Sequence, residues 1–356
     1  MAKDRITSVE VALEAGVSQS AVSRAFTPGA SVSEDTRKKI LKAAKALGYR
    51  PNAIARSLIT SKSRIVAVVV AYFNNQFYPD LLGELSSRLH AQGYQILLFT
   101  GFLDKDSDDL LSQILQYQVD GIILLSTSLS SEFSAECASL GVPVVLVNRT
   151  TAQDDVSSVT SDNFRGGELV ANFLLAGKHK TFAYIAGTPN SSTNRDREAG
   201  FLRRLRSQGI KDVSKARGNY TWEGAAQAAR QLLTNRKRPD AIFCANDHMA
   251  LSVMDVARFE FGLKIPRDLS VVGYDDAGAA RWRSFDLTTM EQPVKEMASA
   301  AAQIMLSQIK RELTTPVHTI VPSALIIRSS ARVPDNWESR REKSPEDRRR
   351  REPAQN

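Results

Sequence analysis

The sequence predicts a small all-α head followed by an α/β body of parallel sheets, and three observations support this fold class. Residues 1–64 carry 12 basic and 5 acidic side chains, whereas residues 65–330 carry 27 and 28. Short amphipathic helical segments fill the head, while short apolar runs alternate with longer amphipathic stretches in the body. A compact basic unit of this kind suits a polyanion, most simply nucleic acid.

The head contains start and stop signals for four short helices. Thr7 or Ser8 caps the first helix, and Gly16 ends it in a tight turn. Ser18 then caps the second helix. Two helices joined in this way form a helix-turn-helix unit, whose second helix enters the major groove of DNA. The alternative is a small helical cap whose charges only solvate it. We expect these apolar side chains to be buried in the first and third helices: Val9, Ala12, Leu13, Ile40, Leu41, Ala44 and Leu47.

The head carries the stretches SVEVALEAGVS at residues 8–18, AVSR at 21–24, VS at 32–33, LGYRPN at 47–52 and ARSL at 55–58. This pattern closely resembles the lactose-repressor (LacI/GalR) family of bacterial transcription regulators. The resemblance implies that the second helix reads base edges, which suits its side chains, since arginine pairs with guanine and glutamine with adenine. The DNA contacts that we expect in the head are Ser18, Gln19, Ser20, Ser23 and Arg24.

The resemblance also implies a hinge helix directly after the head. Asn52 would cap this helix, Ala55 would permit close approach to the minor groove, and Leu58 would insert between base pairs at the operator centre. An apolar wedge unstacks one base step, and contacts on the bent duplex offset that cost. The alternative for Leu58 is a linker leucine that packs on the body.

The body holds about ten strand–helix units, more than one doubly wound domain accommodates. The resemblance implies a periplasmic-binding-protein-like fold of two doubly wound subdomains joined by three crossings, near residues 159–162, 288–292 and 320–323. We expect a helix-turn-helix domain at 1–50, a hinge and linker at 51–64, an effector-binding, dimerising body at 65–330 and a charged, disordered tail at 331–356. Within the body, subdomain 1 would cover 65–160 and 292–319, and subdomain 2 would cover 163–288.

Polar motifs follow several predicted strands, where open α/β sheets bind their ligands. The resemblance places effector contacts on Arg197, Tyr220, Asn246 and Asp275, and we include Arg195 from the same stretch as Arg197. A guanidinium, an amide, a carboxylate and a ring face suit a sugar or a small acid. As alternatives, Asn246 and Asp275 would only cap helices. Arg197 would pair with a surface acid, and Tyr220 would belong to the core.

One position departs from the family pattern. Many relatives have an aspartate after the fourth strand, but this chain has Asn148 followed by Arg149, so the site loses a negative charge and gains a positive one. This change favours an anionic or acid-bearing effector over a neutral hexose. The loop at residues 71–79 is a second source of specificity, in which we expect Asn74 and Phe77 to contact the effector.

Other classes of protein fit the sequence less well. The four histidines lack metal-ligand spacing, and no nucleophile elbow or phosphate loop occurs, so we predict no catalytic residue, metal or cofactor. Cys137 and Cys244 lie far apart, as in proteins of a reducing compartment. The alternative function is a transporter-type solute-binding protein or sensor, which would need an export signal and would have no use for the basic head. No apolar run is long enough to predict a membrane segment.

These features together predict a homodimeric transcription repressor that is located in the cytoplasm and associated with the nucleoid. It would bind a pseudo-palindromic operator in double-stranded DNA under the control of a small metabolite. The tail lacks the leucine heptads with which some relatives form tetramers, and this favours a dimer. The sequence is compatible both with an effector that induces and with one that corepresses.

Overall fold

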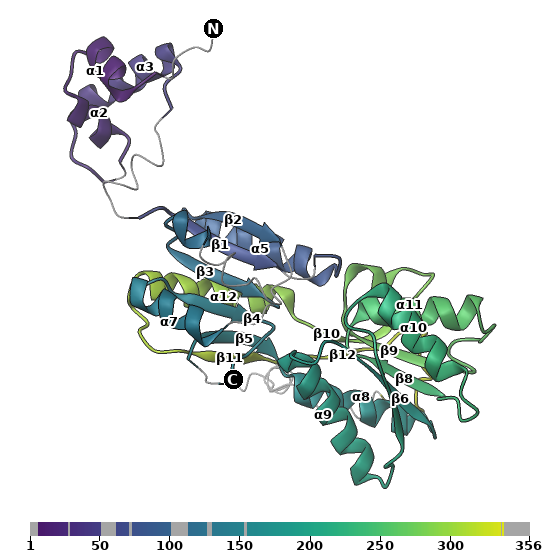
Figure 1. The fold of residues 1–356 in the computed structure, drawn as a ribbon. Coiled ribbons are helices and arrows are strands. Elements are labelled where there is room, and N and C mark those ends of the chain that lie inside the picture. Colours follow the sequence, from purple (N-terminus) through teal and green to yellow (C-terminus); the bar gives the residue numbers. More distant parts are fainter. Residues whose placement is uncertain are drawn as a thin grey trace, which may run out of the picture. The chain divides into compact units, whose positions relative to one another are not determined.

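The computed structural model describes residues 6–27, 29–50, 62–70, 73–100, 113–126, 130–152, 155–335 and 337. The chain divides into two compact units, the head at residues 1–63 and the body from residue 64 onward (Figure 1). The predicted hinge residues Asn52, Ala55 and Leu58 lie outside the described residues, so their roles stay predictions.

The described residues of the head form α1 (Ser8–Ala15), α2 (Gln19–Ala25) and α3 (Glu34–Leu47). They pack around Val11, Val22 and Ile40, each of which is 0% exposed. Ser18 begins α2, because its side chain accepts a hydrogen bond from the N–H of Ala21. Gly16 ends α1 with a φ of 66°, in the left-handed region that glycine adopts without strain. The predicted helix-turn-helix fold of the head is confirmed.

The core of the head differs from the predicted stripe at three positions. Val9, Leu13 and Leu41 are exposed by 49%, 79% and 46%, so their predicted burial is wrong. Val11 and Ala43 are buried instead. The reason is that α1 and α3 each offer two overlapping faces with similar apolar spacing, and packing against the neighbouring helices selects one of them.

The strands of the body are β1 (Ile65–Val70), β2 (Gln95–Thr100), β3 (Gly121–Leu125), β4 (Val144–Val147), β5 (Ser157–Ser161), β6 (Phe182–Ala186), β7 (Val213–Arg217), β8 (Ala241–Cys244), β9 (Ser270–Asp275), β10 (Thr288–Glu291), β11 (His318–Val321) and β12 (Leu325–Ile326). They form one sheet of order β11-β5-β4-β3-β1-β2 and another of order β12-β10-β9-β8-β6-β7. Paired strands run parallel, except that β12 is antiparallel to β10. The predicted α/β body of two doubly wound subdomains is confirmed.

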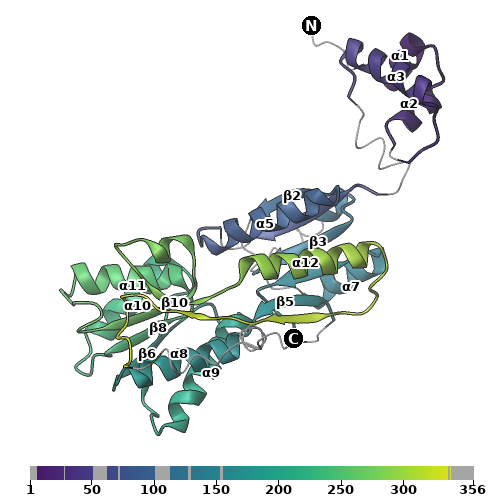
Figure 2. The same cartoon turned by 180° about the vertical axis from the view of Figure 1, so that it is seen from behind.

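Helices cover both faces of each sheet (Figures 1 and 2). Along β1, Val66, Val68 and Val70 belong to one apolar cluster, while Ala67 and Val69 belong to another on the opposite face. This period of two explains why β1 is apolar throughout. Lobe 1 comprises the first sheet with α5 (Phe77–Ala91), α7 (Ser131–Leu140) and α12 (Val294–Ile309). Lobe 2 comprises the second sheet with α8 (Asn163–Ala176), α9 (Ser192–Ser207), α10 (Trp222–Leu233), α11 (Asp247–Phe259) and the 3-10 turn η1 (Gly278–Arg281).

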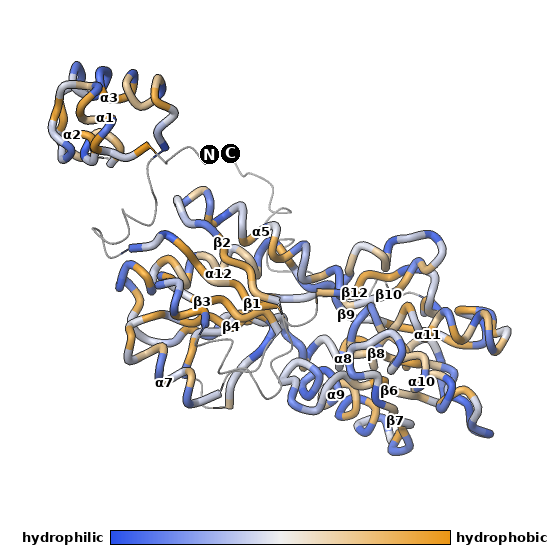
Figure 3. The backbone as a smooth tube through the Cα atoms, turned by 45° about the horizontal axis from the view of Figure 1, so that its top comes forward, coloured by the Kyte–Doolittle hydropathy of each residue, from blue (hydrophilic) through white to orange (hydrophobic). Residues whose placement is uncertain are grey.

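The chain passes between the lobes after β5, after β10 and between β11 and β12 (Figure 2). Each lobe has its own apolar core, and Figure 3 shows hydrophobic residues concentrated along the central strands. Cys137 lies in the core of lobe 1 and Cys244 in that of lobe 2, so the two thiols are buried apart from each other. In the described part of the chain, no helix combines the length and the apolar character needed to span a membrane.

The packed body extends beyond residue 331, where the tail was predicted to begin. Ala331 and Trp337 are buried, and the Trp337 ring meets the Phe173 ring edge to face at 5.1 Å. Arg332 also pairs with Asp240 at 3.3 Å. The predicted start of the tail is therefore too early. The prediction followed the many charged residues of this segment and overlooked Trp337, which packs in the core of lobe 2.

Candidate functional site

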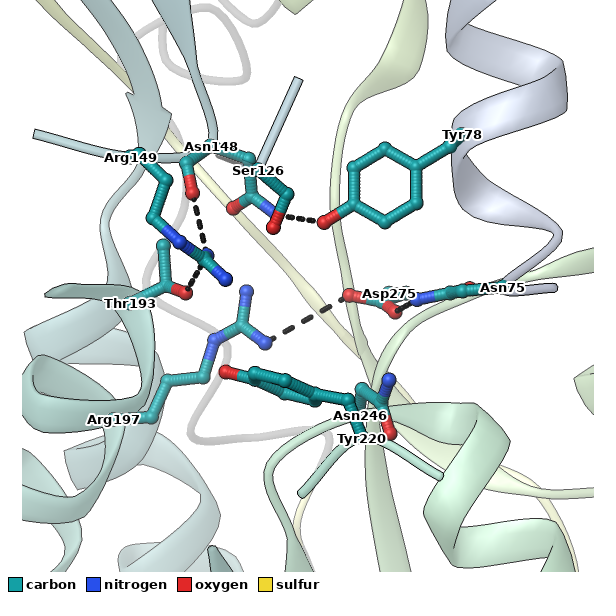
Figure 4. A pocket seen from close by; sticks show the side chains of 10 residues that line it. All are labelled: Asn75, Tyr78, Ser126, Asn148, Arg149, Thr193, Arg197, Tyr220, Asn246 and Asp275. Carbon is teal, nitrogen blue, oxygen red and sulfur yellow. Dashed lines mark hydrogen bonds and ion pairs between the residues drawn. The ribbon is translucent and has the colours of Figure 1, made fainter. Parts of the chain in front are cut away.

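A polar pocket lies between the two lobes, and five of the described residues from each lobe line it (Figure 4). Ser126 follows β3, Asn148 follows β4, and Asp275 ends β9. The pocket is thus built at the carboxyl ends of the strands, as the parallel topology requires. Its lining residues are Asn75, Tyr78, Ser126, Asn148, Arg149, Thr193, Arg197, Tyr220, Asn246 and Asp275.

Four lining residues have a positive φ that is unusual for side chains larger than glycine. The values are 59° at Ser126, 61° at Asn148, 61° at Tyr220 and 132° at Asp275. Asparagine tolerates this region, but such a conformation costs about 1–3 kcal/mol for most other residues. The sharp turns at the strand ends direct these side chains into one space, and the packed sheets hold them there.

Among the described residues, Arg197 of α9 is the largest fully buried side chain, and it lines the pocket. Its Nε donates to Oδ1 of Asn163 at 2.8 Å, and its Nη1 donates to the carbonyl oxygen of Ala245 at 2.5 Å. The guanidinium stacks 3.6 Å from the centre of the Tyr274 ring and lies 3.8 Å from Oδ1 of Asp275. Burial alone would lower the pKa of Arg197, but Tyr274 and Asp275 raise it, so the group stays charged.

The position of Arg197 depends on a close crossing of α8 and α9. A Cβ atom on Gly200 would lie 2.0 Å from the carbonyl oxygen of Phe164, and one on Gly167 would lie 2.2 Å from that of Arg197. Only glycine permits this backbone contact, which brings Arg197 beside Asn163. The glycine-rich stretch after Asn163 therefore serves helix packing.

Asp275 is held by side chains from lobe 1 and from the crossing after β10. Its Oδ2 accepts a hydrogen bond of 2.8 Å from Asn75, and its Oδ1 accepts one of 2.6 Å from Gln292. Burial raises the pKa of Asp275, although Arg197 and these donors oppose the rise. Behind it, the fully buried Asp247 accepts hydrogen bonds from the Thr289 hydroxyl and a backbone N–H. Burial and the charge of Asp275 raise the pKa of Asp247 to about 8.

The wall from lobe 1 contains Tyr78, Asn148 and Arg149. Asn148 donates to the Tyr78 hydroxyl at 3.0 Å, and burial raises the pKa of Tyr78 to about 12, so the phenol is neutral. Nη1 of Arg149 donates to the carbonyl oxygen of Asn148 at 2.8 Å and to Oγ1 of Thr193 at 2.6 Å. The Arg149 guanidinium also lies 5.8 Å from the centre of the Tyr220 ring. The contact with Thr193 links lobe 1 to lobe 2.

Six of the nine residues predicted to contact an effector line this pocket, and three do not. Phe77 is 1% exposed and packs in the core of lobe 1, while Asn74 is exposed. Arg195 points to solvent and pairs with Asp196 at 2.9 Å. These three lie outside the pocket because neighbouring positions point in different directions: Arg195 and Arg197 are about 200° apart around the helix axis. The six that line the pocket are Asn148, Arg149, Arg197, Tyr220, Asn246 and Asp275, and their contact with an effector stays a prediction.

Sequence reasoning missed Asn75, Tyr78, Ser126 and Thr193, which also line the pocket. Ser126 could have been predicted from the sequence, since it directly follows a buried strand as Asn148 does. For Asn246, the alternative of a helix cap holds as well, because its side chain accepts a hydrogen bond from the N–H of Met249. This residue therefore both begins α11 and faces the pocket.

The head presents a separate polar surface on α2. Gln19, Ser20, Ser23 and Arg24 are exposed, while the opposite side of the helix packs in the core. Nε2 of Gln19 donates to the Ser8 hydroxyl at 3.0 Å and links α2 to α1. This surface holds the side chains that were predicted to read base edges.

Comparison with known proteins connects both units to one family. Residues 8–52 match the lacI family of bacterial regulatory proteins, and residues 171–331 match the periplasmic binding protein-like domain. The chain is 31% identical to catabolite control protein A of Priestia megaterium over 92% of this chain and 99% of that protein. It is also 31% identical to the transcriptional regulator CelR of Thermobifida fusca, over 92% and 98%.

Solved structures agree with these relatives. The complex of the transcriptional regulator CelR with cellobiose is 30% identical, with a TM-score of 0.70, over 92% of this chain and all of that chain. The Lac repressor dimer bound to operator and the anti-inducer ONPF is 26% identical, with a TM-score of 0.82, over 92% and 99%. The chain therefore belongs to the lacI family of bacterial regulatory proteins and is a DNA-binding transcription regulator with an effector-binding body.

Proposed function

We propose that this regulator is a repressor that acts as a homodimer, reads a pseudo-palindromic operator in double-stranded DNA with its two heads, and responds to a small sugar or sugar acid in the cleft between its lobes. The observation that carries the proposal is that five polar or aromatic side chains from each lobe converge on one pocket. A ligand held there contacts both lobes at once, so it binds with different affinity when the lobes open.

The chemistry of the pocket suits a hydroxyl-rich ligand. Asn148, Asn246 and Asp275 supply amide and carboxylate groups, and Tyr220 supplies a half-buried ring face. Oδ1 of Asn148 is buried without a hydrogen-bond partner, which leaves an acceptor for a ligand hydroxyl. The CelR relative solved with cellobiose supports a saccharide as the class of ligand.

Control of DNA binding follows from linkage. The effector changes the angle between the lobes, which shifts lobe 1 across the dimer interface and alters whether two hinge helices can pair on DNA. An effector that binds more tightly to the protein with paired hinge helices corepresses. An effector that binds more tightly to the protein with unpaired hinge helices induces. Asn52, Ala55 and Leu58 keep their proposed hinge roles, so Leu58→Ala is expected to reduce operator affinity more than nonspecific affinity.

We also propose that the chain acts by binding alone, without catalysis or a resident cofactor, and works in the cytoplasm on the nucleoid, where its DNA lies. Asp275 is the only carboxylate among the described pocket residues, and both of its oxygens already accept hydrogen bonds. It is therefore poorly placed to act as a general base.

The test is selection of binding sites from random DNA with the purified full-length protein. We expect enrichment of a two-fold symmetric site whose affinity falls steeply with salt, because phosphate contacts release counterions. A solute-binding protein or sensor would enrich no sequence. If nothing is enriched, even after a metabolite extract is added to supply a corepressor, the proposal is wrong.

A further inference from the structure

The pocket carries more positive than negative charge. Arg149 and Arg197 are 5% and 1% exposed, and Asp275 is the one acidic side chain among the described residues that line the space. Asp275 lies 3.8 Å from Arg197, whereas the described residues offer Arg149 no carboxylate within ion-pair distance. The two arginines thus share the single charge of Asp275. A buried cation whose charge is only partly compensated is unfavourable unless a ligand supplies the rest.

Donors of both arginines remain available in the pocket. Nη2 of Arg197 is buried and has no hydrogen-bond partner. Arg149 donates only through Nη1, and only to neutral oxygens, those of Asn148 and Thr193. Figure 4 shows the two guanidinium groups directed into the same space from opposite lobes. A buried donor without a partner, such as Nη2 of Arg197, marks a place where an acceptor binds.

The beginning of α9 adds to the positive potential. Thr193 lines the pocket and lies in the first turn of this 16-residue helix, and that turn carries no acidic residue. First-turn N–H groups have no partner within a helix, and the helix dipole favours an anion there. The N-terminus of α9 and the two arginines therefore all favour a negatively charged group in the pocket.

We propose that the effector bears an acidic group, a carboxylate or a phosphate, that binds between Arg149 of lobe 1 and Arg197 with the first turn of α9 in lobe 2. This inference rests on the proposed function, since it specifies the ligand of the same cleft. Closing the lobes without an anion brings two buried cations together, so the acidic group is the part of the effector that stabilises the closed lobes.

The first experiment uses inorganic phosphate as the probe. Thermal unfolding of the full-length protein is compared in phosphate and in chloride at equal ionic strength. We expect phosphate to raise the midpoint for the wild type and for Arg195→Met, which removes an exposed arginine outside the pocket, but not for Arg149→Met. Arg149→Lys keeps the charge and retains part of the effect, which separates charge from a general defect in folding. An equal phosphate effect in Arg149→Met and the wild type would overturn the proposal.

The second experiment uses calorimetry with matched ligands: glucose, glucuronate and glucose 6-phosphate, and the same three forms of galactose. We expect at least one acid to bind about tenfold or more tightly than its neutral parent, a preference that Arg149→Met abolishes. The affinities of the sugar acids and the sugar phosphates, compared with each other, show whether the site binds a carboxylate or a phosphate. Preference for a neutral sugar, unchanged by Arg149→Met, would overturn the inference, as would failure of phosphate and of every acid to bind. If a neutral sugar still alters affinity for the selected operator, the proposed function stands while this inference fails.

Discussion

The side-chain amide of Asn75 in lobe 1 donates a hydrogen bond of 2.8 Å to Oδ2 of Asp275 in lobe 2. The bond crosses the cleft directly and joins residues 200 positions apart in the sequence. A second bond nearby, from the N–H of Ala279 to Oε1 of Gln76, also joins the lobes. The closed arrangement thus has polar contacts of its own, and a ligand needs only to shift a balance between open and closed lobes.

Loss of the Asn75 amide should weaken closure of the lobes. Asn75→Ala removes a hydrogen bond to a charged group, so we expect effector binding to weaken by about 1.5–3 kcal/mol. Calorimetry measures the affinity, and small-angle scattering measures the radius of gyration with and without ligand. Asn74→Ala is the matched control, because its side chain is exposed and does not line the pocket. Equal losses in both variants would contradict the role of Asn75.

Removal of the Arg197 charge should destabilise the body. Arg197→Met leaves the buried Asp275 without its cation and Asn163 without its donor, and we expect a loss of about 3–5 kcal/mol in the free energy of unfolding. Denaturant unfolding measures this loss. Arg203→Met is the control, since Arg203 is mostly exposed and pairs with Glu168 on the surface, where a pair contributes about 0–1 kcal/mol. A loss for Arg197→Met no larger than for the control would show that the buried network is not stabilising.

Protonation of Asp247 should make stability depend on pH. Its pKa is raised to about 8 in the folded protein, chiefly by burial, so the folded state holds a proton that the unfolded state releases above about pH 4. The free energy of unfolding therefore falls as pH rises from about 4 to about 8, by at most about 1.4 kcal/mol per pH unit, and this contribution then levels off.

The comparison of wild type with Asp247→Asn isolates this contribution. We expect the stability of the wild type relative to the variant to decrease across that pH range in denaturant unfolding. Asp268→Asn is the control: Arg267 lowers the pKa of this half-buried carboxyl to about 2, so the folded protein does not titrate it in the same range. A difference that stays flat or increases with pH would show that Asp247 is ionised in the folded protein.

Substitution on the exposed face of α2 should reduce specific recognition of DNA. Arg24→Ala removes an exposed guanidinium, and we expect the affinity for the selected operator to fall by about 1–3 kcal/mol, with a smaller effect on scrambled DNA. Fluorescence anisotropy with both duplexes measures this. Lys38→Ala on α3 is the control, because its exposed ammonium should affect both duplexes alike. If Arg24→Ala lost the same affinity for both duplexes, Arg24 would contact the phosphate backbone and not the base edges.

The two-unit organisation was predictable because it depends on local signals. Caps such as Ser18 and the glycine turn at Gly16 act over a few residues, and the apolar run of β1 is buried wherever a doubly covered sheet forms. Asn148 and Asp275 follow or end predicted strands, and the family resemblance pointed to these two positions as part of a ligand site. The predicted end of the body at residue 330 was too early because Trp337 is a single aromatic residue among charged ones. Only its contact with Phe173 shows where it packs.

The sequence by itself determined the basic head and the alternating body, since these depend on composition and on periodicity along short segments, and its resemblance to a known family indicated the chemical character of the cleft. Only the tertiary structure decided that Asn75 rather than Asn74, and Arg197 rather than Arg195, face the cleft. It also placed Asp275 beside Asn75 and left a guanidinium nitrogen of Arg197 unpaired. The direction of a side chain depends on how its helix or loop is rotated, and packing between segments far apart in the chain determines that rotation.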